Sequence, residues 1–408
     1  MPHRPTIPIS PLPLAPTGCG SRAGFRTVDP ADAEAAAAAP MPVLKGRGTA
    51  WAIAHRFERD EREAVDDGWG ALDQIASEER VGPETTVVEE HAKRILTAND
   101  SPDISFDLSI NPYRGCEHGC IYCFARPTHS YLNLSPGLDF ETRIVAKVNA
   151  AERVRESFAS LAYEPKLLNI GSATDAYQPV ERRLRITRAV LEVMRECRHP
   201  FSIITKSSGV ERDVDLIGEM ARDGLAGVYI SLTTLDGHLA RTLEPRAAAP
   251  HRRLRTIETL VRAGIPVGVS ASPMIPFLNE PELEHILAAA REAGATSAFC
   301  TVLRLPWEVN PLFQQWLDSH VPDRAARIMA RVRDMCGGND YDATFGQRMV
   351  GTGPWAQLLR DRFHLAQKRL GFRSDRVPLD MTQFVRPASA RRRAAANAIE
   401  DSGQGSLF

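Results

Sequence analysis

Three of the seven cysteines in this 408-residue chain lie close together, and their spacing predicts a metal site. Cys116, Cys120 and Cys123 form a C-x3-C-x2-C pattern in the segment Asn-Pro-Tyr-Arg-Gly-Cys-Glu-His-Gly-Cys-Ile-Tyr-Cys-Phe-Ala-Arg, residues 111–126. Thiolates are soft ligands that suit zinc and iron–sulfur clusters. Three of them within eight residues therefore indicate one of these two kinds of metal centre.

The fourth ligand decides between the two centres. Structural zinc sites are closed by four protein ligands, so zinc would need His118, His129 or a distant cysteine. An iron–sulfur cubane can be held by three cysteines with one iron left open. Gly115 and Gly119 let the loop fold tightly around a bulky cluster, with backbone N–H groups near its sulfides. We expect such a cluster, and zinc remains the alternative.

The remaining cysteines, Cys19, Cys197, Cys300 and Cys336, are scattered along the chain. An odd number of cysteines without an export signal argues against a disulfide framework. We interpret these four as reduced, incidental or buried thiols.

Composition and charge exclude several classes of protein. Hydrophobic residues make up 43% of the chain and the formal net charge is -1, which argues against disordered, collagen-like or coiled-coil chains and against a general polyanion binder. Any nucleic-acid contact must therefore be local. No run reaches the roughly 18 apolar residues of a membrane helix, and residues 1–20 lack the apolar core of a signal peptide. We expect a cytoplasmic protein with no membrane partner.

A regular alternation of strand-like and helix-like stretches begins near residue 104. Apolar, β-branched runs typical of strands occupy residues 104–110, 166–171, 201–205, 227–232, 266–270 and 298–303. Helical periodicity occupies residues 143–161, 180–197 and 282–293. Six β–α units predict a parallel α/β sheet, either doubly wound or curled into a partial barrel. Both architectures place their chemistry at the carboxyl ends of the strands.

The cysteine loop directly follows the first of these strands. Small, hydroxylated or charged residues leave four later strands, at 171–177, 206–208, 231–233 and 270–273. Each alone is ordinary helix-cap chemistry, since Ser, Thr and Asp favour helix N-termini. Four such segments in register favour an active site at this edge.

The flanking regions suggest five parts. Residues 1–45 read as a disordered leader, 46–103 as an N-terminal extension, 104–305 as the core, 306–384 as a cap region, and 385–408 as a flexible basic tail with Arg391, Arg392 and Arg393. The cap is expected to end in an amphipathic helix beginning near Trp355. Its basic residues favour a solvated face over a nucleic-acid surface.

The cysteine pattern, with Tyr122 before its last cysteine, resembles the radical S-adenosylmethionine (SAM) superfamily. A narrower resemblance, to the spore photoproduct lyase branch, rests on the segments Asn111–Cys116, Thr174-Asp175, Ile204–Lys206 and Tyr229–Ser231. The uncharacterised bacterial members of this branch also resemble the chain in Gly46-Arg-Gly and in Phe345-Gly-Gln-Arg-Met. The resemblance covers about residues 46–372. It implies a partial (β/α)6 TIM-like barrel with an N-terminal extension and a C-terminal helical cap.

The resemblance also implies two cofactors, a 4Fe-4S cluster and SAM. Cys116, Cys120 and Cys123 would hold three irons, and the fourth would bind the amino and carboxylate groups of SAM. Reductive cleavage of SAM would give a 5'-deoxyadenosyl radical that removes hydrogen from a substrate. A reductase or flavodoxin-type protein would supply the electron.

Further roles carry over residue by residue. Thr174 and Asp175 would hold the methionine end and ribose of SAM, Lys206 its carboxylate, and Ser231 the ribose or carboxylate. Tyr122 and Phe124 would pack around adenine or the cluster.

One departure from the branch leaves the substrate open. Photoproduct lyases use a cysteine after the second strand as hydrogen-atom donor, but residues 169–178 contain none, and Ser172 stands at about that place. A serine O–H bond is too strong for the same task. Cys300 would be either an alternative donor or a buried core thiol.

The terminal Gln404-Gly-Ser-Leu407-Phe408 resembles the pentapeptide with which bacterial DNA repair proteins bind the replication sliding clamp, although Gly405 stands where Leu is usual. A flexible tail with a Leu-Phe anchor is the form such motifs take. This tail favours DNA as the substrate class. The alternative function is a non-catalytic iron–sulfur or zinc protein tethered to the clamp.

Overall fold

The computed structural model describes residues 44–57, 83–375 and 377–388. The part of the predicted leader up to residue 43, the three tail arginines, and Gln404, Leu407 and Phe408 of the terminal motif all lie outside the described residues. The proposed boundaries between the five parts stay predictions.

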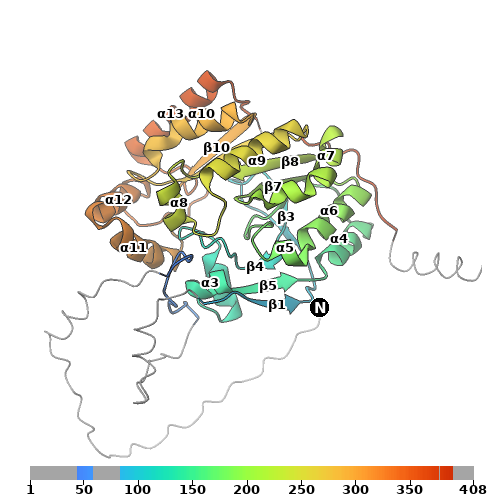
Figure 1. Ribbon diagram of the computed structural model, residues 1–408, viewed down its shortest axis with the longest axis horizontal. Coiled ribbons are helices and arrows are strands. Elements are labelled where there is room, and N and C mark those ends of the chain that lie inside the picture. Colours follow the sequence, from blue (N-terminus) through green and yellow to red (C-terminus); the bar gives the residue numbers. More distant parts are fainter. Residues whose placement is uncertain (1–43, 58–82, 376, 389–408) are drawn as a thin grey trace, which may run out of the picture. The chain divides into compact units, whose positions relative to one another are not determined.

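A seven-stranded sheet forms the centre of the fold (Figure 1). Its strands lie in the order β10-β9-β8-β7-β6-β3-β2, and β3 to β10 pair in parallel while β2 is antiparallel at one edge. The bounds are β2 (Leu96–Ala98), β3 (Leu108–Ile110), β6 (Leu168–Ile170), β7 (Phe201–Thr205), β8 (Ala226–Ser231), β9 (Val267–Met274) and β10 (Ser297–Val302). The six parallel strands fall on the six predicted runs, which confirms the partial (β/α)6 barrel.

Helices connect these strands, and all but the short helix at residues 237–243, which packs near the cysteine loop, cover one face of the sheet (Figure 1). They are α4 (Ala150–Ala159), α5 (Glu181–Leu184), α6 (Ile186–Glu196), α7 (Val214–Arg222), α8 (Gly237–Leu243), α9 (Pro250–Arg262) and α10 (Leu283–Glu292), with short 3-10 turns η2 (Ser208–Asp213) and η3 (Glu280–Glu282). One core joins buried strand residues such as Ile203 and Val228 to helix residues such as Val190 and Leu216. The predicted helix at 282–293 is confirmed. The stretch at 180–197 is interrupted where Arg185 takes a left-handed φ of 52°.

The prediction of one helix over residues 143–161 was wrong at its start. Residues Arg143–Lys147 form strand β5, which lies between β1 (Thr86–Glu90) and β4 (Tyr113–Arg114) in a second, three-stranded sheet. Ile144 and Ala146 alternate with less buried residues, so the period there is two, and only α4 has the helical period. Leu161, the last residue of the predicted helix, is 91% exposed beyond the end of α4.

A helical cap follows the last strand. It contains α11 (Val309–His320), α12 (Pro322–Met335) and α13 (Gly353–Leu370). The first two pack their buried faces on the region of the cysteine loop, and α13 lies against α10 and α12. Two shorter elements, η1 (Arg126–Leu132) and α3 (Leu138–Thr142), follow the cysteine loop itself. No helix in the described part of the chain is long and apolar enough to cross a membrane.

The segment after α13 covers the amino ends of the strands. Backbone N–H groups of Arg373, Asp380 and Val385 donate to carbonyls of Thr296, Gly224 and Cys197, at 2.9, 2.9 and 2.8 Å. These three carbonyls immediately precede β10, β8 and β7 or lie within a few residues of them. The cysteine loop follows β3 and so lies at the opposite edge of the sheet, where the parallel strands have their carboxyl ends.

Candidate active site

The cysteine loop leaves β3 and turns back on itself through two glycines. Gly115 and Gly119 have φ values of 79° and 66°, in the left-handed region that favours glycine. A Cβ at Gly119 would lie 2.6 Å from an oxygen of Glu141, so the loop has no room for a side chain there. Cys116 and Cys120 are buried and Cys123 is partly buried. The predicted need for glycine at these two positions agrees with the backbone.

A buried ion pair holds the cysteine loop in place. Arg126 Nη2 lies 2.5 Å from Oε1 of Glu141, and both side chains are fully buried. Arg126 Nε and Nη2 also donate to the carbonyls of Cys120 and Gly119, at 2.9 and 3.1 Å, and Nη1 donates to the carbonyl of Gly137 at 2.9 Å. Burial raises the pKa of the Glu141 carboxyl, while Arg126 acts in the opposite direction. The guanidinium thus fixes the loop backbone at Gly119 and Cys120.

A strap from the N-terminal extension, residues 47–53, covers this ion pair. The Gly48 N–H donates to Oε2 of Glu141 at 2.9 Å, and Arg47 Nη1 donates to the Glu141 carbonyl at 3.1 Å. A Cβ on Gly48 would lie 1.9 Å from the Gly119 carbonyl oxygen, so the two backbones are in direct contact. The Gly46-Arg-Gly motif therefore acts on the cysteine loop, a relation that the sequence pattern did not show.

Tyr122 points into a buried polar cluster formed after β8. Its hydroxyl donates to Glu244 and lies 3.2 Å from the Thr233 hydroxyl, which donates to the same carboxylate at 2.6 Å. Arg253 on α9 pairs with the other oxygen of Glu244. Burial alone would raise the pKa of Glu244, but Arg253 and Lys206 lower it to about 2. The carboxylate therefore stays charged inside the site.

Lys206 lies at the end of β7 beside the same cluster. Its Nζ is 5.8 Å from the centroid of the Tyr122 ring. Burial lowers its pKa, but the nearby Cys120 and Glu244 outweigh this, and the pKa of Lys206 is raised overall. The structure thus places a cation next to the cysteines, where the family resemblance expects a partner for the SAM carboxylate.

Asp175 and Thr174 follow β6 and are both engaged within the protein. Asp175 Oδ1 accepts from the Thr205 hydroxyl at 2.7 Å, and Oδ2 accepts from the Lys206 N–H at 2.8 Å and lies 3.2 Å from His118 Nδ1. Burial alone would raise the pKa of Asp175, but His118 and these bonds hold it well below its usual range. Thr174 donates to the Gly115 carbonyl at 2.6 Å. Both residues touch the cysteine loop, and their contacts with SAM remain predictions.

The other two predicted contacts occupy opposite environments. Ser231 is buried at the end of β8, and its carbonyl accepts from Arg253 Nη1 at 3.0 Å. Phe124 is 47% exposed, and the guanidinium of Arg304 lies 5.2 Å from its ring centroid. The structure therefore brings Tyr122, Lys206 and Ser231 around one polar cluster, with Phe124 outside it.

Ser172, which stands where the lyase branch has its donor cysteine, and Cys300, the alternative donor, both have structural surroundings. Ser172 is hydrogen-bonded to Asn111, with Asn111 Nδ2 at 3.3 Å from its hydroxyl. Cys300 packs against the core shared by strands and helices, and burial raises its pKa to about 12. The Cys300 environment matches the core-thiol interpretation.

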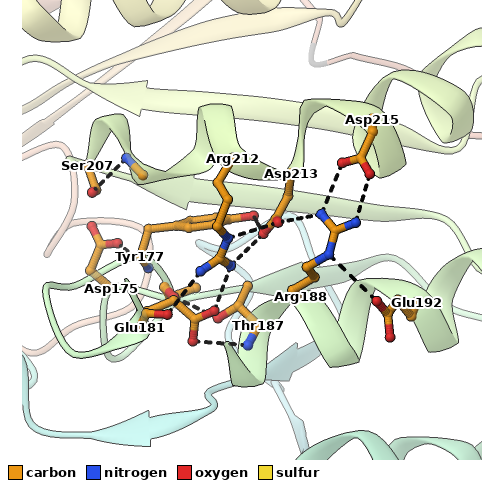
Figure 2. A network of polar contacts seen from close by, with 12 residues as sticks. Asp175, Tyr177, Glu181, Thr187, Arg188, Glu192, Ser207, Arg212, Asp213 and Asp215 are labelled. Atoms are coloured by element: carbon orange, nitrogen blue, oxygen red, sulfur yellow. Dashed lines mark hydrogen bonds and ion pairs between the residues drawn. The ribbon is translucent and has the colours of Figure 1, made fainter. Parts of the chain in front are cut away.

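A second polar network lies behind the first residues of the loop (Figure 2). The Tyr113 hydroxyl donates to Glu181, and Arg212 bridges Glu181 and Asp213 at 2.7 Å to each. Arg188 continues the chain of contacts from Asp213 to the exposed Asp215, at 2.9 and 2.7 Å. The network anchors β4, α5, α6 and η2 to one another. It supports the loop without contributing a residue to the cysteines.

Sequence reasoning missed Arg126, Glu141, Glu244 and Arg253. A signal existed for Arg253, which occupies the apolar stripe of α9 with Ile257 and Leu260, at the i+4 and i+7 positions. A charged residue in such a stripe needs a buried partner. Glu141 offers no comparable pattern, because its partner is set by the fold of the loop.

The donor set fits an iron–sulfur cluster better than zinc. No three His, Cys, Asp or Glu side chains within the described ranges lie close enough to hold one metal ion. Zinc needs all its ligands at about 2.0–2.3 Å from a single ion, whereas the cysteines of a cubane bind separate irons. His118 and His129, the two candidate zinc ligands, are among the described residues that this statement covers. The zinc alternative therefore has no support.

Comparison with known proteins agrees with this assignment. Residues 110–290 match the family model "Radical SAM superfamily". An uncharacterised protein of Mycobacterium tuberculosis (strain ATCC 25618 / H37Rv) is 34% identical over 226 residues, which are 55% of this chain and 66% of that protein. An uncharacterised protein of Methanocaldococcus jannaschii is 27% identical over 237 residues, 58% of this chain and 84% of that protein.

Solved structures with a similar chain path include spore photoproduct lyase complexed with dinucleoside spore photoproduct. It has a TM-score of 0.47 and 13% identity, and the match covers 70% of this chain and 81% of that one. The Streptococcus suis protein SuiB bound to S-adenosylmethionine has a TM-score of 0.35 and 12% identity, covering 64% and 46%.

Residues 110–290 therefore carry a radical SAM domain. This confirms the predicted family, whose members use a 4Fe-4S cluster and SAM. The chain spans 66% of the length of its Mycobacterium relative.

Proposed function

We propose that this protein is a radical SAM enzyme that abstracts a hydrogen atom from its substrate. The observation that carries the proposal is the cysteine loop itself: three cysteines on a glycine-dependent turn at the carboxyl edge of the sheet, with Lys206 and Tyr122 beside them. When bound, the cluster and SAM supply the radical chemistry.

The protein's own residues orient the cofactors and exclude water. Cys116, Cys120 and Cys123 hold the cluster, and Arg126 and the strap fix the loop that carries them. Lys206 supplies a point charge for the carboxylate of SAM. Tyr122, kept in place by Glu244 and Thr233, closes one side of the site.

DNA is the substrate class that we propose, and the support is the terminal motif Gln404–Phe408, which resembles a clamp-binding peptide. A flavodoxin-type reductase would supply the electron. Deletion of residues 404–408 should abolish binding to the bacterial sliding clamp in a pull-down with purified clamp. Unchanged binding, or none in the full chain, would reject the clamp as a partner.

Anaerobic reconstitution tests the catalytic proposal. We expect about four irons per chain, absorption near ~410 nm that bleaches with dithionite, and 5'-deoxyadenosine from SAM. Cys120→Ala should lose all three properties, while Cys300→Ala, which changes a core thiol outside the loop, should keep them. Full reduction without any SAM cleavage would contradict the proposal.

A further inference from the structure

Arg304 is the residue from which the further inference starts. It follows β10, and the preceding Leu303 still donates its N–H to the Met274 carbonyl at the end of β9, at 3.2 Å. Its guanidinium carbon lies 5.2 Å from the ring centroid of Phe124, which directly follows Cys123. The loop after the last parallel strand thus meets the loop after the first, beside the cysteines.

The donors of Arg304 have only weak acceptors. Nη1 lies 3.4 Å from the Met349 sulfur, and Nη2 lies 3.4 Å from the Tyr341 hydroxyl. A thioether is a weak acceptor, and 3.4 Å is longer than an ordinary N–H to O hydrogen bond. Nε is buried and has no hydrogen-bond partner in the described part of the chain.

Arg304 also lacks a carboxylate within ion-pair distance among residues 44–57, 83–375 and 377–388. The carboxylate that influences it through space, Asp103, is bonded to Arg348 at 2.6 Å. Arg153 and Arg331 also have a buried, unpaired Nε, but their Nη atoms pair with Glu156 and Asp334 at 2.7 and 2.8 Å.

The unpaired donors of Arg304 destabilise the fold unless another group accepts hydrogen bonds from them. A buried N–H of a charged group without an acceptor costs free energy, and the planar guanidinium matches the two oxygens of a carboxylate or phosphate. The other arginines at this edge, Arg126 and Arg253, already have their glutamates. Only a group from outside these residues can fill the same role for Arg304.

We propose that Arg304 binds an oxyanion of the substrate, a phosphate ester or a carboxylate, beside Phe124 and the cysteine loop. The assignment of that anion to a substrate rests on the proposed function, because it takes the neighbouring cysteines as the reaction centre. The exposed ring of Phe124 then lies against the group that carries the anion. Arg304 selects substrates by charge and sets which of their atoms faces the cluster.

Matched pairs of small probes test this inference. Isothermal titration of the reconstituted protein with SAM would compare uridine 5'-monophosphate with uridine, and phenylacetate with phenylacetamide, at millimolar concentrations. We expect one anion to bind at least tenfold more tightly than its neutral counterpart. Preference for the monophosphate identifies a phosphate ester, and preference for phenylacetate identifies a carboxylate.

Variants locate the effect. Arg304→Met should remove the anion preference and Arg304→Lys should keep part of it, because lysine retains the charge but loses the fork. Arg331→Met is the matched control, since Arg331 also lies over an aromatic ring, that of Trp355, and also has a buried, unpaired Nε, but pairs with Asp334. A preference that survives in Arg304→Met, or none in the wild-type protein, would overturn the inference.

The two proposals can fail separately. Titration measures binding alone, whereas 5'-deoxyadenosine formation without a probe measures the catalytic proposal alone. A protein that cleaves SAM but binds both members of each pair equally refutes only the role of Arg304. A protein with the anion preference that never cleaves SAM supports the anion site and refutes the proposed function.

Discussion

Two arginines flank the cysteine loop, and their surroundings differ sharply. Arg126 is fully buried, pairs with Glu141 and donates to the carbonyls of Gly119, Cys120 and Gly137. Arg304 faces a thioether and a phenol at 3.4 Å and no carboxylate within the described residues. Arg126 therefore stabilises the fold through internal bonds, whereas Arg304 has hydrogen-bond donors available for a ligand.

The difference separates stability from recognition. Removing one partner of a buried, hydrogen-bonded ion pair leaves a charge uncompensated, which destabilises the fold strongly. Removing a guanidinium without an internal carboxylate removes little native-state bonding. Variants that break the Arg126–Glu141 pair should therefore lower stability, whereas variants of Arg304 should change ligand binding.

The largest effect is expected at the internal pair. Glu141→Gln leaves the Arg126 charge without its counter-charge and should lower the free energy of unfolding by about 3 to 5 kcal/mol, measured by urea unfolding of the apoprotein. The control is Glu284→Gln, which breaks a partly exposed pair with Arg362 and should cost less than about 1 kcal/mol. Equal losses of unfolding free energy in the two variants would show that the Arg126–Glu141 pair stabilises the fold no more than a surface pair does.

The second prediction concerns pH and the Glu244 cluster. Because the folded-state pKa of Glu244 is about 2, below its ordinary 4.5, its charge stabilises the fold above pH 4.5, and this stabilisation is lost as the pH falls towards 2. Glu244→Gln should be less stable by about 3 kcal/mol at pH 7. Unfolding curves from pH 7 to pH 2 should show the gap to wild type closing below pH 4.5. A gap that is constant over this range would argue against a buried carboxylate.

The third prediction concerns the strap. Gly48→Ala places a Cβ against the Gly119 carbonyl oxygen, so the two backbones must separate at a cost of about 1 to 3 kcal/mol. The displaced loop should hold less iron after reconstitution, as measured by iron per chain. Gly237→Ala is the control, because a Cβ there meets nothing within 4 Å and its φ is not positive. Full iron content in Gly48→Ala would mean that the strap does not position the cysteines.

The smallest effect on stability is expected at Arg304. Arg304→Met should leave the free energy of unfolding of the apoprotein unchanged or raise it by about 1 kcal/mol, since it removes no ion pair and does remove a buried, unpaired N–H. Thermal unfolding of this variant beside Glu141→Gln would measure the contrast directly. A loss of stability as large as that of Glu141→Gln would show that Arg304 stabilises the fold instead of serving as a ligand contact.

The parts of the fold that sequence alone could predict depend on short-range patterns. The six parallel strands follow from apolar runs, and the three cysteines from their spacing. Asp175, Lys206 and Ser231 were predicted at one edge because parallel strands end together. The polar contacts of these residues then depend on side chains from several strands.

The parts that could not be predicted depend on contacts between distant segments. Gly48 and Glu141 are 93 residues apart, and Tyr122 and Glu244 are 122 apart, with no periodicity to join them. Strand β5 was assigned to a helix because its partner β1 comes from the N-terminal extension, where no strand was expected. Pairing with that strand decides the local structure there.

Electron paramagnetic resonance of the reduced, reconstituted protein tests the central claim most directly. If Cys116, Cys120 and Cys123 hold a cubane with one open iron, dithionite reduction gives a 4Fe-4S signal whose g values change when SAM is added, because SAM binds that iron. The account predicts this change in the wild-type protein and no 4Fe-4S signal in Cys120→Ala. A wild-type signal that is identical with and without SAM would contradict the account.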